Sequence, residues 1–326
     1  MPRLRKTKIP QEYSPPMAFL DVEGLSVSYG TRAGRVHALD DVGFSLKEGE
    51  SLGIAGESAC GKSTLGLAIM RMLQGGRIDS GAISMRGESL LDMAERRFSA
   101  EYRWKRISMI FQGAMSSLDP VYTIRSQFSE VLRQHGFEGD REGRMEEAAT
   151  SVGLEPGVLG RYPHELSGGM KQRAVTAMAL LLKPDLVIAD EPTTALDVLV
   201  QAQIINLLKR LKKEGTSFII ITHDLSILSE IADKVGIMYG GQIAELGSSE
   251  DVYGSPRHPY TQGLLASIPK LRGEKPGYIR GSPPGLISPG SGCRFADRCP
   301  DVMEKCSTDP PKAGTKSGYA KCWLYE

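Results

Sequence analysis

The sequence predicts an α/β fold with a parallel central sheet, and three observations lead to this fold class. Short apolar runs of strand length occur at residues 51–55, 186–190 and 218–221, as expected for strands buried on both faces. The first two runs are each followed by a loop and then by a segment with helical spacing of apolar residues, starting near 65 and 198. The composition also changes twice, which marks an inserted helical segment and a distinct C-terminal region.

Length and charge exclude several classes of protein. The chain has 326 residues, 40% of them hydrophobic, so it can bury a full core. Its 40 basic and 39 acidic residues give a net charge of +1, which offers no reason to expect a nucleic acid partner. The basic N-terminus lacks a following apolar segment, and no apolar run is long enough to span a bilayer. We expect a soluble, cytoplasmic protein.

The first half of the chain divides into a tail and a series of β segments. Residues 1–16 are basic and contain proline, so we expect a disordered tail. Residues 19–29 partly alternate between polar and apolar, as a half-buried strand does. Residues 35–46 suggest a second and a third β segment. Two further strand-like stretches follow, at 81–86 and 107–111.

The second half begins with a polar, helix-prone stretch. Residues 113–171, which include helix-like runs at 127–134 and 142–152, predict an inserted helical subdomain. A helix is expected from Val198 to about Gly215, and a hairpin over residues 235–246. Beyond Ser255, proline, glycine, serine and cysteine predominate, which predicts a separate, loop-rich C-terminal module.

One glycine-rich loop lies between the strand at 51–55 and the following helix. It fits the pattern G-x-x-x-x-G-K-[ST] in the strand–loop–helix context that this pattern requires. The glycines let successive backbone N–H groups face an anion, and the helix N-terminus adds positive charge. Lys62 is expected to reach the β- and γ-phosphates of a nucleotide, and the Ser63 hydroxyl to bind Mg²⁺. The predicted nucleotide-binding residues are Gly56, Glu57, Ser58, Ala59, Cys60, Gly61, Lys62, Ser63 and Thr64.

An acidic pair follows the apolar run at 186–190. Asp190 and Glu191 emerge at the carboxyl end of a predicted strand, which is the edge of an open α/β sheet where ligands bind. We expect Asp190 to hold Mg²⁺, through water, and Glu191 to orient or deprotonate the attacking water.

Residues 166–173, Leu-Ser-Gly-Gly-Met-Lys-Gln-Arg, distinguish among nucleotide-binding families. In this context they resemble the signature motif of the ABC (ATP-binding cassette) ATPases, through Ser167, Gly168 and Gly169. Several further residues resemble family motifs in the same order along the chain. They are Tyr29 (adenine-stacking aromatic), Gln112 (Q-loop, a ligand of Mg²⁺), Asp197 (D-loop) and His223 (switch histidine).

Taken singly, three of these residues have simpler interpretations. Tyr29 could be an ordinary strand aromatic, Gln112 a solvated polar residue and His223 a core histidine. The order of all the motifs favours the family. The resemblance covers residues 17–255 and implies a RecA-like core with an antiparallel β subdomain and the helical insert at 113–171.

The resemblance also implies a partner. In this family the signature motif of one ATPase domain closes over the ATP held by the P-loop of another. One P-loop and one signature therefore cannot complete a site alone, and a paralogous subunit or a second copy of the chain is required.

Further segments indicate which group of proteins within this family the chain resembles. Residues 111–120, 190–198, 256–264 and 281–285 resemble the ATP-binding subunits of dipeptide and oligopeptide permeases, with the C-terminal tail (256–326) of the D-type. This resemblance implies an ATP-hydrolysing subunit at the cytoplasmic face of the membrane. It would act with a second ATPase subunit, two transmembrane permease subunits and, indirectly, an extracytoplasmic peptide-binding protein. Transport of another solute, such as nickel or glutathione, and a non-transport ABC ATPase are the alternatives.

Four of the five cysteines lie in the last 34 residues. Their spacing matches neither zinc ribbons nor the ferredoxin pattern, so a metal site and reduced bystander thiols or disulfides both remain open. The permease resemblance favours a 4Fe-4S cluster over Zn²⁺, held by Cys293, Cys299, Cys306 and Cys322. Cys60 is interpreted as a small tolerated side chain, the alternative being an oxidisable thiol at a helix N-terminus.

Overall fold

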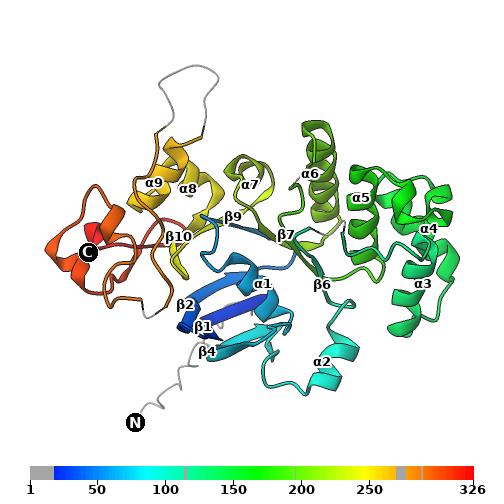
Figure 1. Ribbon diagram of the computed structural model, residues 1–326, viewed down its shortest axis with the longest axis horizontal. Coiled ribbons are helices and arrows are strands. Elements are labelled where there is room, and N and C mark those ends of the chain that lie inside the picture. Colours follow the sequence, from blue (N-terminus) through cyan, green and yellow to red (C-terminus); the bar gives the residue numbers. More distant parts are fainter. Residues whose placement is uncertain (1–17, 114–115, 195, 269–276, 288) are drawn as a thin grey trace, which may run out of the picture.

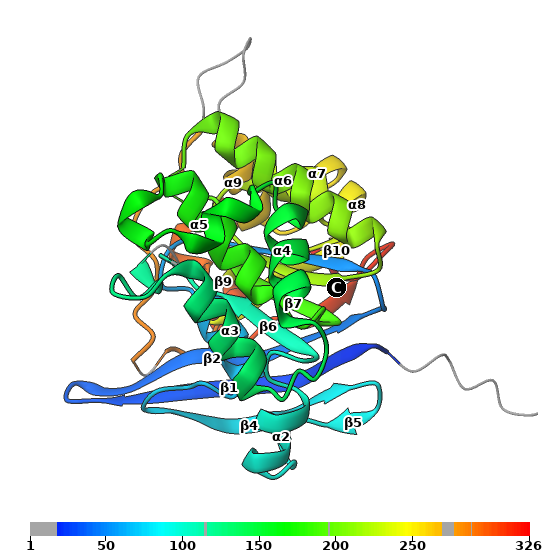
Figure 2. The same ribbon diagram turned by 90° about the vertical axis from the view of Figure 1, so that its right-hand side faces the viewer.

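The computed structural model describes residues 18–113, 116–194, 196–268, 277–287 and 289–326. The tail predicted over residues 1–16 lies outside them. Two β-sheets form successive layers, and helices cover the outer face of the larger sheet (Figure 1). The view in Figure 2 shows the same layers from the side, with the smaller sheet at the bottom.

Among the described residues, the larger sheet has eight strands in the order β11-β12-β10-β9-β3-β8-β7-β6. Five of them, from β9 to β6, run parallel, and β10, β12 and β11 extend the sheet in antiparallel fashion. The strands are β3 (Ser51–Ala55), β6 (Ile107–Ile110), β7 (Leu186–Asp190), β8 (Ser217–Ile221), β9 (Lys234–Tyr239), β10 (Gln242–Ser248), β11 (Lys312–Gly314) and β12 (Tyr319–Lys321).

The parallel strands bring the predicted motifs to one edge. Because parallel strands end on the same side of a sheet, the loops after β3, β6, β7 and β8 meet there. These loops carry Gln112, Glu191 and His223, and Lys62 is the first residue of the helix that follows the loop after β3. Every residue of these four strands is buried, as the apolar runs at 51–55, 186–190 and 218–221 predict for three of them.

The smaller sheet is antiparallel, in the order β2-β1-β4-β5. Residues 35–46, expected as two β segments, form one continuous strand. The reason lies at Asp41, whose backbone is left-handed (φ 52°) and whose N–H donates to Ser26 Oγ at 3.1 Å, so that an irregularity bends the strand without ending it. The strands are β1 (Leu20–Thr31), β2 (Gly34–Leu46), β4 (Gly76–Met85) and β5 (Glu88–Ser89).

An arm of α3, α4 and α5 lies at one end of the molecule (Figure 1, green), where the helical insert is predicted, and α5 continues past the predicted bound at residue 171. Polar N-caps start its helices: Thr123 for α3, Asp140 for α4 and Ser167 for α5. The helices are α1 (Lys62–Ile69), α2 (Glu95–Glu101), α3 (Ile124–Gln134), α4 (Arg141–Ser151), α5 (Gly168–Ala179), α6 (Val198–Lys213), α7 (Leu225–Ile231), α8 (Ser249–Gly254) and α9 (Pro259–Ala266).

Two apolar cores hold the layers together. One lies between the large sheet and helices α3–α7, and the other between that sheet, α1 and the small sheet. Gly66 of α1 packs closely on the sheet, since a Cβ there would lie 3.1 Å from Ile188 Cγ2. Within the described ranges, no helix combines the length and apolarity needed to cross a membrane.

The C-terminal region is joined to the core rather than standing apart as a separate module. Its strand β12 pairs with β10 of the large sheet, at Glu245 with Ala320 and Leu246 with Tyr319. This pairing covers an edge that would otherwise expose unpaired backbone groups. Local composition indicated loops and gave no sign of this long-range pairing. The helix α9 is likewise packed on the body, with Tyr260 fully buried.

Candidate functional site

A cavity of 520 Å³ lies at the carboxyl edge of the parallel strands. Nine of the sequence-predicted site residues line it, which brings together segments from β1, the glycine-rich loop, and the loops after β6 and β7. They are Tyr29, Ser58, Ala59, Gly61, Lys62, Ser63, Thr64, Gln112 and Glu191.

The glycine-rich loop depends on two glycines. Gly56 and Gly61 have positive φ angles of 152° and 102°. A Cβ at Gly56 would lie 2.1 Å from the carbonyl oxygen of Met238, and one at Gly61 would lie 2.2 Å from that of Ala38. Since both obstacles are backbone atoms of neighbouring strands, no side chain fits at either position.

Lys62 bridges the loop from within. Its Nζ donates to the carbonyl oxygens of Gly56 and Glu57, both at 2.8 Å, and the residue is only 8% exposed. The thiol of Cys60 lies 3.7 Å from the same Nζ. Burial raises the pKa of Cys60, although Lys62 acts against it. The thiol is therefore protonated and enclosed, as the interpretation of a small tolerated side chain expects.

Asp190 carries an unpaired oxygen into the site. The residue is 3% exposed, and its Oδ1 has no hydrogen-bond partner. Burial is the main influence on its pKa and raises it, while a hydrogen bond with Ser63 opposes the shift. A buried carboxylate oxygen without a partner is costly, unless a cation or its water completes the coordination.

Glu191 is held by three side chains. Its Oε1 lies 3.1 Å from His223 Nδ1, and its Oε2 accepts from Thr194 Oγ1 at 2.8 Å and Gln112 Nε2 at 3.3 Å. Its backbone is left-handed, with φ 50°. Burial acts to raise the pKa of Glu191, but the hydrogen bonds from Thr194 and His223 outweigh it and leave the pKa below its usual value. Glu191 is therefore an ionised acceptor at neutral pH.

The signature residues do not reach this cavity. Ser167 is the exposed N-cap of α5, and Asp197 is the exposed N-cap of α6. The two helix starts adjoin, because a Cβ at Gly169 would lie 2.9 Å from Val200 Cγ1. Together with Gly168, these residues form a surface on the arm side, separate from the cavity that their own chain lines.

Sequence reasoning missed one wall of the cavity. This wall is apolar and comes from β2 and from the C-terminal region, two parts of the chain far apart in sequence. The motif at residues 281–285 was a signal, but nothing local connected it with the nucleotide. The missed lining residues are Val36, Ala38, Pro283, Pro284 and Leu286.

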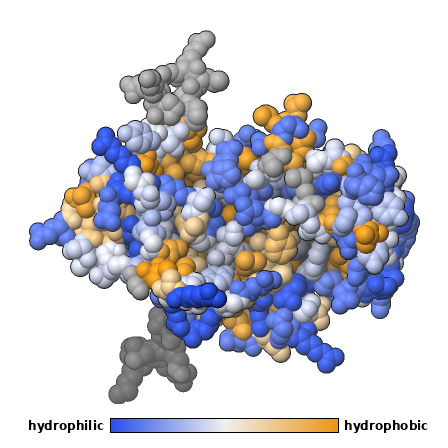
Figure 3. All heavy atoms as spheres, in the orientation of Figure 1, coloured by the Kyte–Doolittle hydropathy of each residue, from blue (hydrophilic) through white to orange (hydrophobic). Residues whose placement is uncertain are grey.

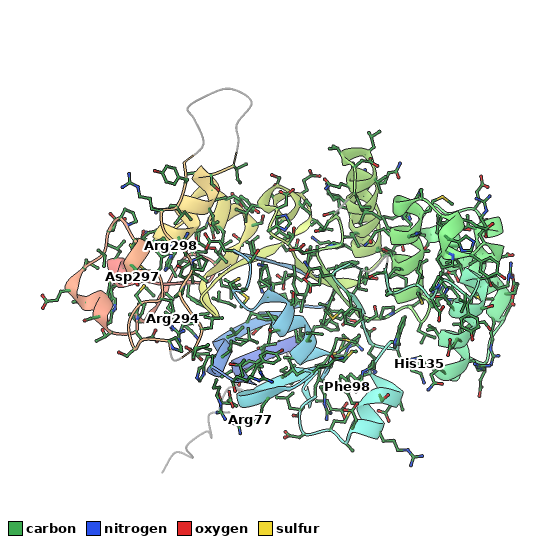
Figure 4. The ribbon with its side chains drawn as sticks, in the orientation of Figure 1. Arg77, Phe98, His135, Arg294, Asp297 and Arg298 are labelled. Carbon is green, nitrogen blue, oxygen red and sulfur yellow. The ribbon has the colours of Figure 1, made fainter. Side chains whose placement is uncertain are left out.

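A second missed contact ties the C-terminal region to the glycine-rich loop. Arg298 donates from both terminal nitrogens to the carboxylate of Glu57, at 2.7 and 2.9 Å, and to Tyr239 Oη at 3.1 Å. The backbone N–H of Glu57 donates to Tyr260 Oη at 3.0 Å. Glu57 is thus bound on both sides by other parts of the chain. Figure 4 shows Arg298 and Arg294 where the C-terminal region meets the body of the molecule.

We expect Arg298→Ala to lower the free energy of unfolding by about 2 kcal/mol, because it leaves the half-buried Glu57 carboxylate without its partner. Urea unfolding of the full chain measures this change. Arg97→Ala is the matched control, since Arg97 pairs with Glu88 at an exposed site where a salt bridge contributes little. The double variant Glu57→Gln/Arg298→Ala should lose less unfolding free energy than the sum of the losses in the two single variants. Equal losses of unfolding free energy in Arg298→Ala and Arg97→Ala would contradict the stabilising role of the Arg298–Glu57 ion pair.

The four C-terminal cysteines lie near one another but are not arranged as a metal-binding site. The N–H of Cys293 donates to the carbonyl of Cys306 at 2.9 Å. Burial raises the pKa of Cys293, and the neighbouring thiols of Cys306 and Cys322 raise it further. Burial and nearby thiols, including Cys293, also raise the pKa of Cys299 to about 11. In the described part of the chain, no three His, Cys, Asp or Glu side chains are arranged to hold a metal ion.

Comparison with known proteins identifies the relatives. Residues 39–194 match the family model "ABC transporter", and residues 244–306 match "Oligopeptide/dipeptide transporter, C-terminal region". The dipeptide transport ATP-binding protein DppD of Bacillus subtilis is 42% identical over 318 residues, covering 94% of this chain and 95% of that protein. The oligopeptide transport ATP-binding protein OppD of Escherichia coli is 44% identical, covering 90% and 89% respectively.

Solved structures show the same fold. The ATP-binding cassette MJ0796, in a dimeric post-hydrolysis state bound to ADP and Pi, aligns with a TM-score of 0.63 at 25% identity, over 71% of this chain and 98% of that one. These matches confirm the family resemblance that the motifs indicated and the predicted fold class. This chain belongs to the ABC transporter ATP-binding proteins, the family that includes the dipeptide and oligopeptide transport ATP-binding proteins.

Proposed function

We propose that the chain hydrolyses ATP to drive the import of dipeptides or oligopeptides. The observation that carries the proposal is the match to both family models in a chain whose cavity is lined by Lys62, Gln112 and Glu191, with His223 in contact with Glu191. Relatives at 42–44% identity bear the names of dipeptide and oligopeptide transport proteins. An idle, regulatory subunit would not need Lys62, Asp190, Glu191 and His223 together.

In the proposed site, the glycine-rich loop and Lys62 bind the β- and γ-phosphates. The residues around Asp190 fit Mg²⁺, because a buried carboxylate oxygen lacks a partner and the Ser63 hydroxyl lies beside it. Ser63, Asp190 and Gln112 would hold the ion. When bound, Mg²⁺ neutralises charge on the phosphate oxygens.

Glu191 is the proposed general base. Its ionised carboxylate would accept the proton of the water that attacks the γ-phosphorus, and ADP would leave with the bridging oxygen. His223 and Thr194 fix the carboxylate from one side, and Gln112 reaches the same oxygen as Thr194. Gln112 is thus placed to connect the hydrolytic site with the helical arm that begins after it.

The catalytic unit would be a pair of ATPase domains. The exposed Ser167, Gly168 and Asp197, together with the half-buried Gly169, would close over the nucleotide of a partner, either a paralogous subunit or a second copy. The first residues of α6 support a contact here, because Val198 and Leu199 are 79% and 78% exposed. Apolar atoms are visible at the top of the molecule over α6 in Figure 3. MJ0796 was likewise solved as a dimer.

The full transporter would add two transmembrane permease subunits and an extracytoplasmic peptide-binding protein, with this chain at the cytoplasmic face of the membrane. We assign residues 17–255 to the ATP-binding domain, with 113–171 as its helical subdomain, and residues 256–326 to the C-terminal region. The match of residues 244–306 to the transporter C-terminal model supports this division.

Co-purification and uptake test the import role. The native complex should contain the permease subunits and a second ATPase subunit, and membrane vesicles carrying it should take up radiolabelled peptides in an ATP-dependent manner. Uptake should stop when this subunit carries Glu191→Gln. ATP-driven uptake of nickel or glutathione, with none of peptides, would replace the peptide assignment with the alternative solutes.

We further propose that Cys293, Cys299, Cys306 and Cys322 hold a 4Fe-4S cluster. Four gathered thiols fit either this cluster or Zn²⁺. Burial raises the pKa of Cys293, Cys299 and Cys322, so ligation at these residues would release protons. The group would have a structural or redox-sensing role, because ATP hydrolysis needs no electron transfer.

Anaerobic purification followed by iron, sulfide and zinc analysis tests the cluster. We expect a coloured protein with about four irons per chain. Cys306→Ser should lose the colour, whereas Cys60→Ser, which lies in the glycine-rich loop, should keep it. A colourless protein with one zinc per chain would overturn the iron–sulfur assignment and support Zn²⁺.

A further inference from the structure

Residues 281–286, Gly-Ser-Pro-Pro-Gly-Leu, have no part in the hydrolysis described above, yet they lie at the nucleotide cavity. Pro283, Pro284 and Leu286 line it. The segment follows α9 and runs beside the end of β2 (Figure 1, orange). The C-terminal region therefore contributes directly to the site, about 250 residues after Tyr29 in sequence.

The cavity has two chemically different linings. The glycine-rich loop, Gln112 and Glu191 supply charged and polar groups suited to phosphates and Mg²⁺. The remaining lining is apolar except for one phenol hydroxyl, that of Tyr29, and it joins β1 and β2 to the proline segment. A flat, uncharged base is the part of a nucleotide that such a lining suits. The apolar lining consists of Tyr29, Val36, Ala38, Pro283, Pro284 and Leu286.

The proline segment is fixed at both ends. On its C-terminal side, the carbonyl of Leu286 accepts from the N–H of His37 at 2.9 Å, and Ile287 forms an antiparallel bridge with β2. On its N-terminal side, the carbonyl of Arg280 accepts from Arg298 Nε at 2.8 Å. Two consecutive prolines restrict the backbone between these anchors. The wall is thus formed before any nucleotide arrives, which lowers the entropy cost of binding.

Tyr29 is fixed as well. A Cβ at Gly76 would lie 2.7 Å from its Cε1, so the glycine allows the phenol ring to lie against β4. Pro284 is packed on the neighbouring loop, with its Cγ 3.2 Å from where a Cβ of Gly240 would stand. The aromatic and the proline sides of the apolar lining are therefore both rigid.

We propose that residues 281–286 form a wall of the base-binding subsite, in which Pro283, Pro284 and Leu286 contact the base and ribose of the ATP held by the same chain. Proline offers no backbone N–H, and these side chains carry no hydrogen-bonding groups. The wall consequently strengthens binding through apolar contact without reading the edge of the base. ATP and GTP should depend on it equally.

The test compares nucleotides with inorganic triphosphate, which has the phosphates but no base. In the full chain carrying Pro283→Ser and Pro284→Ser, calorimetry should show ATP and GTP affinities lowered about tenfold, the range of base-stacking contacts. The affinity for inorganic triphosphate should not change. The matched control is Pro289→Ser, in the same loop but not part of the lining, which should leave all three affinities unchanged.

Two outcomes in the variant with Pro283→Ser and Pro284→Ser would contradict the proposed base-binding wall. One is an unchanged ATP affinity, and the other is a parallel fall in the affinities for ATP and triphosphate. The second would mean that the substitutions disturb the phosphate site instead. The inference rests on the proposed nucleotide site. If that site itself were wrong, the wild-type chain would bind neither ATP nor triphosphate.

Photolabelling of the wild-type chain gives evidence that does not depend on folding of a variant. With 8-azido-ATP and tryptic digestion, we expect label on the peptide of residues 281–294, protected by excess ATP. Protectable label confined to peptides before residue 200 would place the base away from the C-terminal region and would overturn the proposal.

Discussion

Glu191→Gln should bind ATP with unchanged affinity and hydrolyse it about 10²- to 10⁴-fold more slowly, the range of general base catalysis. The amide has nearly the shape of the carboxylate but accepts no proton from water. The environment of Glu191 is built for an anion, because Thr194 donates to one oxygen at 2.8 Å and His223 lies 3.1 Å from the other. The low pKa that these contacts give Glu191 keeps the base ionised at neutral pH.

Because ATP would bind without being cleaved, the same variant should accumulate as a nucleotide-bound pair of ATPase domains. Phosphate release and light scattering in the presence of ATP measure the two effects. Glu214→Gln, at the exposed end of α6, is the control and should behave as wild type. Hydrolysis by Glu191→Gln at the wild-type rate would show that Glu191 is not the base.

Lys62→Ala should lower the affinity for ATP by about 100-fold. Lys62 is 8% exposed, and its ammonium group donates to two backbone carbonyls of its own loop at 2.8 Å, so it is already positioned inside the phosphate cradle. Charge-assisted hydrogen bonds contribute about 1.5–3 kcal/mol each, and two such bonds to phosphate oxygens account for a loss of this size.

Inorganic triphosphate separates this effect from that of the proline wall. The affinity for triphosphate should fall together with that for ATP in Lys62→Ala, whereas the proline substitutions should affect ATP alone. Calorimetry with the full chain measures both ligands, and Lys213→Ala, exposed at the end of α6, is the control. ATP binding by Lys62→Ala as tight as that of the wild type would contradict the assignment.

The sequence predicted the glycine-rich loop and the acidic loop because each is encoded locally. An apolar run, a glycine pattern and a helix start specify the loop from Gly56 to Thr64 without reference to the rest of the chain. The same holds for Asp190, the last of the five buried residues of β7, and for Glu191, which follows it. The rule that parallel strands end at one edge then predicts that these loops meet, and the cavity lined by Lys62 and Glu191 agrees with it.

The details of the acidic pair depended on packing. Local sequence gave no sign that Thr194 would hold Glu191, nor that Oδ1 of Asp190 would be buried without a partner. The contact between Glu191 and Gln112 joins residues 79 positions apart. Such contacts follow from how strands align in the sheet, and no short pattern encodes the alignment.

By itself, the sequence determined the fold class and the family, and it supplied the residues that we propose as phosphate-binding and acidic groups, since short-range patterns and residue chemistry specify all of them. Only the tertiary structure decided where the C-terminal region lies. It placed Arg298 on Glu57, 241 positions away, and set the prolines of residues 281–286 beside Tyr29 in the nucleotide cavity. The physical reason is that these contacts depend on strand pairing and on a bidentate ion pair between distant segments, whose free energies are realised only when the whole chain is folded.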